Sequence, residues 1–427
     1  MKITPEQIRS HNEKRSGSHR ISYETLADQL ALKNMDTESV INRLSHFQVA
    51  IPSWALGAGG TRFGRFPIGG EPGSLEEKIE DVGLLHALNS SSGAISLHIP
   101  WDIPGDAEAI SQQAEELDLK FDAVNSNTFQ DQKDQEYSYK FGSLCHTDAA
   151  VRKQAVNHNI EVIRHGEALG SKAITIWLSD GSNFPGQQNF RKALQRTLDS
   201  LEEIYNQLPS DWKMLIEYKP YEPNFYSMVI PDWGTSMLLA SKLGDQAKTL
   251  VDLGHHLPNT NIEQIVATLM LEGKLGGFHF NDSKYGDDDL TTGSIKPYQL
   301  FLIFCELVEN IDKQEEVFSA ISWMIDASHN VKDPLEDLLQ SVEAIQNAFA
   351  RALLVNRGEL EEARDANDVT RAQEILQDAF WTDVRPLLRE ARLRGGAAIN
   401  PTELFRELEV RNELIRARGT ESVATGL

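Results

Sequence analysis

Cysteine is scarce in this chain, whose 427 residues include two, Cys145 and Cys305. Each lies in or beside an apolar segment, so we expect buried free thiols in a reducing, cytoplasmic compartment and no disulfide framework. Long apolar runs are lacking as well, because stretches such as 300–305 fall far short of the roughly 20 residues that a membrane-spanning helix needs. The polar start MKITPEQIRSHNEKRSGSHR predicts no signal peptide. We therefore expect no membrane span.

Basic residues are outnumbered, because 41 Lys and Arg stand against 64 Asp and Glu and give a formal net charge of −23. Phosphate binding depends on clustered Lys and Arg, so this balance argues against a nucleic-acid partner. The excess of carboxylates suits a protein that holds divalent cations. The hydrophobic share of 40% and the charged share of 25% are ordinary for a globular protein with a large core.

Eight short apolar or β-branched runs alternate with amphipathic helical stretches, which is the pattern of βα units and a parallel sheet. Eight is the number that a (β/α)8 barrel requires. The runs are 48–54, 94–100, 120–125, 173–180, 213–219, 249–253, 275–282 and 322–328. The expected fold class is therefore α/β, a TIM barrel.

Helical segments flank the expected barrel. Residues 1–46 predict N-terminal helices, with Ser22 and Asp36 as N-caps. Residues 47–350 would form the catalytic (β/α)8 barrel. The charged, Arg-rich and Glu-rich residues 351–427 predict a long helical C-terminal extension that wraps another subunit.

In such a barrel the active site lies at the C-terminal ends of the strands, where this sequence is strongly polar. Glu217 and Lys219 are two positions apart on a strand, so both point to the same face. Charged groups that converge on one concave site require partners of opposite charge, because burial of an unpaired charge costs free energy. The polar and aromatic residues at these ends are Trp54, His98, Asn125, Trp177, Asp180, Glu217, Lys219, Asp252, His255, His279, Asn281 and Asp326.

A pair of divalent metal ions would explain why these charged groups converge. Four ligands, one from each of strands five to eight, would surround one ion: Glu217, Asp252, His279 and Asp326. A second, more open set would use His255, Asp287 and Asp289, with Asp252 bridging both ions. No thiolate is involved, which favours Mn²⁺, Mg²⁺ or Co²⁺ over a structural zinc, and the spacing does not choose among them. We expect two divalent ions per subunit, with Mn²⁺ as the first candidate and Co²⁺, Mg²⁺ or Zn²⁺ as alternatives.

Each of these features alone has an ordinary structural explanation. A loop such as YGDDDL is usually a solvated turn. A lone His on an apolar strand, such as His98 or His279, is more often a hydrogen-bonded core residue than a ligand. Trp54 and Trp177 alone would be core aromatics. The metal interpretation rests on the combination, because carboxylates or imidazoles end four consecutive strands.

The order Glu-x-Lys, Asp-x-x-His, His, Asp-x-Asp and Asp resembles the xylose isomerase superfamily. Longer strings are similar to the Pseudomonas-type L-rhamnose isomerases of broad aldose specificity, and this resemblance covers nearly the whole chain. One departure is Tyr218, where that family has His. The strings are SLHIPWD (96–102), NSNTF (125–129), DGSNFPGQ (180–187), VDLGHH (251–256), GKLGGFHFNDSKYGDDDL (273–290) and MIDASHN (324–330).

The resemblance assigns roles to these residues. It implies a structural metal in the first ligand set and a catalytic metal in the second. Lys219 would bind the substrate oxygens and His98 would contact the sugar near its ring oxygen, so we expect Lys219, His98 and Asp289 to be catalytic. Trp54 and Trp177 would pack on the carbon skeleton of the sugar. Phe63 would reach the site of a neighbouring subunit, in a homo-oligomer expected to be a tetramer.

The implied activity is the interconversion of L-rhamnose and L-rhamnulose, and of other aldoses such as D-allose with D-psicose. Either a hydride shift or proton transfer through an ene-diol is compatible with the residues. The closest alternative is a sugar epimerase, which would need two glutamates on one metal. An abasic-site endonuclease of the same fold is disfavoured by the acidic charge, and an inactive sugar-binding protein by the complete ligand set.

Overall fold

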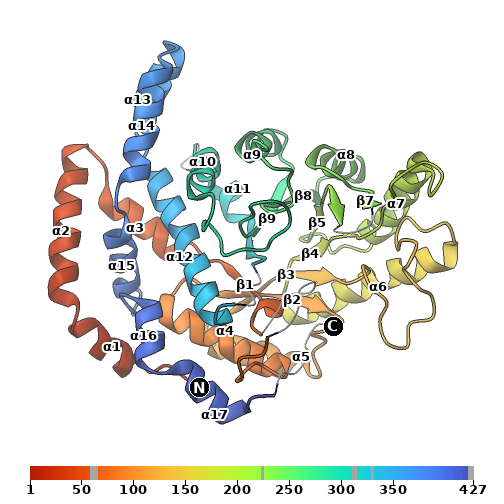
Figure 1. Cartoon of the computed structure of the whole chain (residues 1–427), viewed down its shortest axis with the longest axis horizontal. Helices are drawn as coiled ribbons and strands as arrows, with labels where there is room; N and C mark the ends of the chain where they lie inside the picture. Colours follow the sequence, from red (N-terminus) through yellow and green to blue (C-terminus); the bar gives the residue numbers. More distant parts are fainter. Residues whose placement is uncertain (58–65, 223–225, 310, 312–314, 328–330, 422–427) are drawn as a thin grey trace.

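The structure, a computed structural model, describes residues 1–57, 66–222, 226–309, 311, 315–327 and 331–421. Within them, eight parallel strands close into a barrel in the spatial order β1, β10, β9, β8, β5, β4, β3, β2 (Figure 1). The strands are β1 (Ala50–Pro52), β2 (Ala94–Ile99), β3 (Lys120–Ser126), β4 (Ala173–Ile176), β5 (Lys213–Glu217), β8 (Ala247–Asp252), β9 (Leu275–Phe280) and β10 (Ser322–Ile325). Each expected run overlaps one of these strands, so the TIM-barrel prediction is confirmed.

Helices follow the strands and cover the barrel from outside (Figure 1). Most begin at an Asp, Asn or Ser whose side chain accepts a backbone N–H of the first turn, which stabilises the start of a helix. These helices are α4 (Leu75–Asn89), α5 (Ala107–Glu116), α6 (Ala149–Leu169), α7 (Phe190–Tyr205), α8 (Trp233–Leu243), α9 (Ile262–Leu271), α10 (Pro297–Leu307) and α12 (Pro334–Leu353). Two small elements, α11 (Glu315–Ser319) and the hairpin of β6 (Tyr221–Glu222) with β7 (Tyr226–Ser227), lie between them.

Three N-terminal helices pack against the C-terminal extension (Figure 1). Arg394 binds Glu38 at 2.5 Å, and His19 contacts Glu390 at 2.9 Å. Asp36 caps its helix as expected, whereas Ser22 lies inside a helix, so its predicted role as an N-cap is wrong. The helices are α1 (Pro5–Glu13), α2 (Ser16–Leu32), α3 (Thr37–His46), α15 (Arg385–Arg394), α16 (Pro401–Glu407) and α17 (Val410–Arg418).

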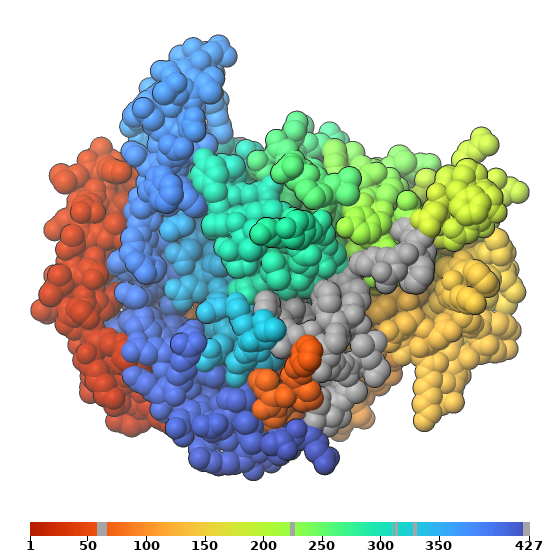
Figure 2. Space-filling model, viewed as in Figure 1, coloured from red at the N-terminus to blue at the C-terminus, as the bar shows by residue number. Residues whose placement is uncertain are grey.

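The remaining part of the extension contacts the barrel helix α10, where Phe380 packs on Tyr298 and Phe301. Helices α13 (Arg357–Asp365) and α14 (Val369–Trp381) form a pair that projects from the body (Figures 1 and 2). The extension thus packs partly on its own chain, and its contact with another subunit stays a prediction, as do the boundaries at residues 46 and 350. Cys145 and Cys305 are buried and free, as expected. Among the described residues, no helix is long and apolar enough to cross a membrane.

Close packing of α6 on the barrel depends on Gly166. A Cβ atom there would lie 2.6 Å from Trp212 and 2.9 Å from Val124. We expect Gly166→Ala to lower the free energy of unfolding by about 1–3 kcal/mol, because overpacking outweighs the better helix propensity of Ala. Urea unfolding measures this effect. The matched control is Gly17→Ala in α2, where a Cβ meets nothing within 4 Å and should raise stability. If Gly166→Ala and Gly17→Ala stabilised the protein equally, the close packing of α6 at Gly166 would be contradicted.

Candidate active site

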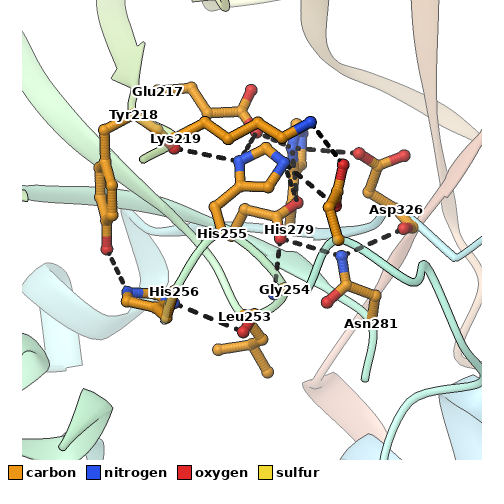
Figure 3. A network of polar contacts seen from close by, with 12 residues as sticks. Glu217, Tyr218, Lys219, Leu253, Gly254, His255, His256, His279, Asn281 and Asp326 are labelled. Atoms are coloured by element: carbon orange, nitrogen blue, oxygen red, sulfur yellow. Dashed lines mark hydrogen bonds and ion pairs between the residues drawn. The ribbon is translucent and has the colours of Figure 1, made fainter. Parts of the chain in front are cut away.

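The first expected ligand set comes together at the C-terminal ends of four neighbouring strands. Glu217 ends β5, Asp252 ends β8, and the pairing of Asp252 with His279 aligns β8 with β9. One possible ligand atom from each member lies within 4.8 Å of the others: Glu217, Asp252, His279 and Asp326. Figure 3 shows Glu217, His279 and Asp326 turned toward one another. Parallel strands that end at one edge therefore build this group.

A second group shares Asp252 with the first. It joins Asp252, His255 and Asp287, again with one ligand atom each within 4.8 Å. The Nε2 atom of His255 lies 3.3 Å from Asp287, and its Nδ1 atom lies 3.0 Å from the carbonyl oxygen of Tyr218 (Figure 3). The Tyr218 ring turns away from both groups, and its hydroxyl contacts His256 at 2.7 Å. The structure thus brings together six of the seven expected ligands.

Asp289 is the seventh expected ligand, and neither group includes it. Its side chain is buried, two residues beyond Asp287 in the loop that follows β9. The bend of this loop is fixed where Asp288 accepts the backbone N–H groups of Lys284 and Tyr285. Asp289 adopts a left-handed backbone with φ of 46°, a conformation that Asp tolerates better than most residues. Its role as a ligand stays a prediction.

The charges of the cluster fit a divalent cation. Burial raises the pKa of Asp252, and the Asp326 and Glu217 carboxylates raise it further against the opposing charge of His255. Burial lowers the pKa of His279, but Glu217 outweighs that effect and holds this pKa above its ordinary value. A His279 imidazole with this raised pKa provides positive charge that the neighbouring carboxylates require. A bound divalent ion would provide it instead and leave the imidazoles neutral, as metal ligands must be.

A buried ligand atom also favours a cation. Asp252 Oδ2 has no hydrogen-bond partner among the described residues, and it lies 3.7 Å from His279 Nδ1. Asp252 is oriented through its other oxygen, which accepts Asn281 Nδ2 at 2.9 Å and the Gly254 N–H at 2.7 Å. A set of carboxylate oxygens and imidazoles suits Mn²⁺, Mg²⁺, Co²⁺ or Zn²⁺. The residues present therefore fit the expected ions.

Lys219 lies beside the second group. Its ammonium is buried and binds Asp287 and Glu222 at 2.6 Å each. It also lies 5.3 Å above the ring of Trp177, a cation–π distance. Glu222 belongs to the β6–β7 hairpin and was missed by the sequence analysis. The sequence signal that could have identified Glu222 is its position three residues after Lys219, at a polar strand end.

An aromatic wall lies next to these groups. The His98 ring stacks on Trp101 with centroids 4.2 Å apart, and it meets the edges of Trp54 at 5.4 Å and Phe129 at 5.6 Å. Phe129 continues the wall to Trp177 at 4.8 Å. Burial lowers the pKa of His98 to about 3, so its imidazole is neutral. The wall offers flat apolar faces of the kind that pack on a sugar skeleton.

The structure unites the expected Trp54, His98 and Trp177 in this wall and adds Trp101 and Phe129, which the sequence analysis did not select. The Trp54 indole also donates to Asp326 at 2.7 Å, which ties the wall to the first ligand group.

Comparisons with known proteins assign the family. Residues 92–302 match the family model described as the xylose isomerase-like TIM barrel. A probable sugar isomerase of Rhizobium meliloti (strain 1021) is 50% identical over 404 residues, which cover 95% of this chain and 94% of the relative. A probable sugar isomerase of Mesorhizobium japonicum is 49% identical and covers 99% and 98% of the two chains. The chain belongs to the xylose isomerase-like TIM barrel family.

A solved structure agrees with the fold of this xylose isomerase-like protein. An L-ribulose 3-epimerase superposes with a TM-score of 0.53 at 14% identity, and the match covers 76% of this chain and 98% of that one. At this identity the likeness shows the fold alone. The family model and the two relatives confirm the resemblance to the xylose isomerase superfamily.

Other residues at the strand ends of the xylose isomerase-like barrel have structural partners. Asn125 donates to the carbonyl oxygen of Leu97 at 3.1 Å. Asp180 accepts the backbone N–H groups of Ser143 and Cys145 and thereby holds a loop. The expected substrate contact Phe63 lies outside the described residues.

Proposed function

We propose that the protein is a metal-dependent aldose–ketose isomerase that interconverts L-rhamnose and L-rhamnulose and also accepts aldoses such as D-allose. The supporting observation is the pair of ligand groups that share Asp252, with Lys219 beside them and an aromatic wall above. The proposal includes two divalent ions per subunit, Mn²⁺ first, with Asp289 as an additional ligand of the second ion. The family membership limits the reaction class, and the site chemistry supports the choice within it.

The residues of the site have distinct tasks in this reaction. The two groups, which share Asp252, would hold divalent ions, and these would supply Lewis acidity for the reaction of the open-chain sugar. The Lys219 ammonium donates hydrogen bonds to the oxygen on which negative charge develops, and Asp287 and Glu222 hold it in place. The neutral His98 ring hydrogen-bonds the sugar near its ring oxygen. Trp54 and Trp177 pack on the carbon skeleton and exclude water.

A sugar epimerase is the second candidate, because an L-ribulose 3-epimerase shares the fold. An epimerase exchanges a proton at one carbon and would use two glutamates on one ion. Among the described residues, the two ligand groups contain a single glutamate, Glu217, and Asp326 takes the place of a second. The second group beside the first also supports an isomerase, which must hold the oxygens of two carbons.

Product analysis separates the two candidates. The purified protein is incubated with Mn²⁺ and either L-rhamnose or a 2-ketose, and the sugars are identified by carbon-13 NMR. We expect an equilibrium of aldose and 2-ketose with the configuration at C3 unchanged. Inversion at C3 without formation of an aldose would identify an epimerase and contradict the proposal.

We also propose that Phe63 completes the site of a neighbouring subunit in a tetramer. Phe63→Ala is then expected to weaken discrimination among sugars by about 1–3 kcal/mol, because it removes part of an apolar wall, while bound metal is unchanged. The matched control is Phe66→Ala, which changes an exposed ring three residues further on. Kinetics on several aldoses test the contribution of Phe63 to the site, and light scattering tests the tetramer. An active monomer, or equal kinetics of the two variants on every sugar, would refute the shared site.

A further inference from the structure

A buried ion pair lies behind the aromatic wall. Lys78 of α4 binds Asp102 at 2.6 Å, and their side chains are 2% and 1% exposed. Asp102 follows β2 by three residues, in the turn that carries Trp101. Neither residue belongs to the ligand groups or to the wall itself. The pair therefore needs an explanation of its own.

The Asp102 carboxylate connects two segments of the chain. Its Oδ2 atom accepts the hydroxyl of Ser53 at 2.5 Å and the backbone N–H of His98 at 2.8 Å. The backbone N–H of Asp102 donates in turn to the carbonyl oxygen of His98 at 2.9 Å. Ser53 precedes Trp54 in a short 3₁₀ helix after β1. One carboxylate therefore links the segment of Trp54 to the segment of His98 and Trp101.

Stability alone gives a weak reason for this arrangement. Taking both charges out of water costs several kcal/mol per ion, and an apolar pair of similar volume often stabilises a protein as well or better. The geometry gives a stronger reason, because Lys78 Nζ binds Asp102 Oδ1 while Oδ2 faces Ser53 and His98. The ammonium thus fixes the orientation in which the other oxygen accepts both hydrogen bonds.

We propose that Asp102, oriented by Lys78, is a positioning residue that sets the spacing and angle of Trp54, His98 and Trp101 and so determines how tightly the sugar is held. The inference rests on the proposed function for the identity of the ligand. It adds residues that touch neither the sugar nor the ions. The ring distances of the wall, 4.2 Å and 5.4 Å from His98, are the quantities that the carboxylate controls.

Two double variants test this role without leaving a buried charge unpaired. Lys78→Met with Asp102→Ala removes the charges and the acceptor, whereas Lys78→Met with Asp102→Asn removes the charges and keeps an acceptor oxygen for Ser53 and His98. Ser53→Ala is a milder third variant that removes one link. Arg392→Met is the control, because Arg392 is a buried cation of the helical layer that contacts Glu343 at 3.3 Å. Metal content, melting temperature, KM, kcat and quenching of tryptophan fluorescence by L-rhamnitol are measured for each.

We expect the Ala double variant to raise KM and the Kd of L-rhamnitol about tenfold or more, with kcat changed by less than about threefold and metal content unchanged. The Asn double variant should restore KM to within about threefold of the wild type, and Ser53→Ala should raise it severalfold at a nearly unchanged melting temperature. Arg392→Met should lower the melting temperature and leave KM unchanged.

Several results would overturn the positioning role. A folded Ala double variant with wild-type KM would leave the pair a purely stabilising role. Equal increases of KM in the Asn and Ala variants would show that the accepted hydrogen bonds do not position the wall. If both double variants fail to fold, a wild-type KM for Ser53→Ala decides against the inference. A wild-type protein that binds L-rhamnitol but isomerises no sugar would instead contradict the proposed function and leave the binding comparison valid.

Discussion

Glu217→Gln and Asp326→Asn are each expected to abolish isomerase activity and to lower the melting temperature of the protein prepared with Mn²⁺. Each substitution removes a charged oxygen ligand of the first group, and a bound ion stabilises only the folded state. The temperature difference between variant and wild type should shrink when both are prepared with a chelator, because the wild type then loses the same stabilisation. Differential scanning calorimetry and metal analysis of the same samples measure this effect.

The matched control for the first prediction is Glu272→Gln, which makes the same chemical change on an exposed side chain at the end of α9. It should leave activity, metal content and melting temperature unchanged. Full activity of Glu217→Gln after chelation and dialysis, without added metal, would show that the first group holds no ion needed for turnover.

Lys219→Met is expected to lower kcat by about 10²–10³, the usual cost of removing one donor to a developing oxyanion. Metal content should be retained, because Asp287 loses a competing cation at 2.6 Å and becomes more available as a ligand. Steady-state kinetics and metal analysis of the variant give both numbers.

Lys172→Met controls for the loss of a lysine, since Lys172 is exposed and pairs with Asp211 just before β4, at the opposite end of the barrel. It should keep wild-type kinetics. A Lys219→Met variant with kcat within a few-fold of the wild type would contradict the role of the ammonium in catalysis.

The sequence allowed prediction of the barrel and of the six candidate ligands that the structure groups, because both follow from periodic patterns. A buried parallel strand is a short apolar run, and the residue that ends it lies at the barrel mouth. Glu217, Asp252 and His279 could therefore be placed from their positions in such runs. The same reasoning extended the run at 173–180 too far, because β4 ends at Ile176 and the polar residues after it form a loop.

Residues that act through tertiary contacts could not be found in this way. Lys78 lies in a helix about 20 residues before the strand end that it supports, and no local pattern connects it with Asp102. Trp101 and Phe129 each follow a strand, where an isolated aromatic residue is more often part of the core. The packing of α15 on α3 joins segments more than 330 residues apart, and it depends on ion pairs such as Arg394 with Glu38 that helical periodicity does not encode.

Metal titration of the chelated protein tests the central claim most directly. Mn²⁺ is added in steps, and bound metal, melting temperature and turnover of L-rhamnose are recorded at each step. The paired groups that share Asp252 predict saturation at two ions per chain. The first equivalent should chiefly raise the melting temperature, and turnover should rise mainly with the second. Full turnover without bound metal, or saturation of metal and turnover together at one ion per chain, would contradict the two-ion site.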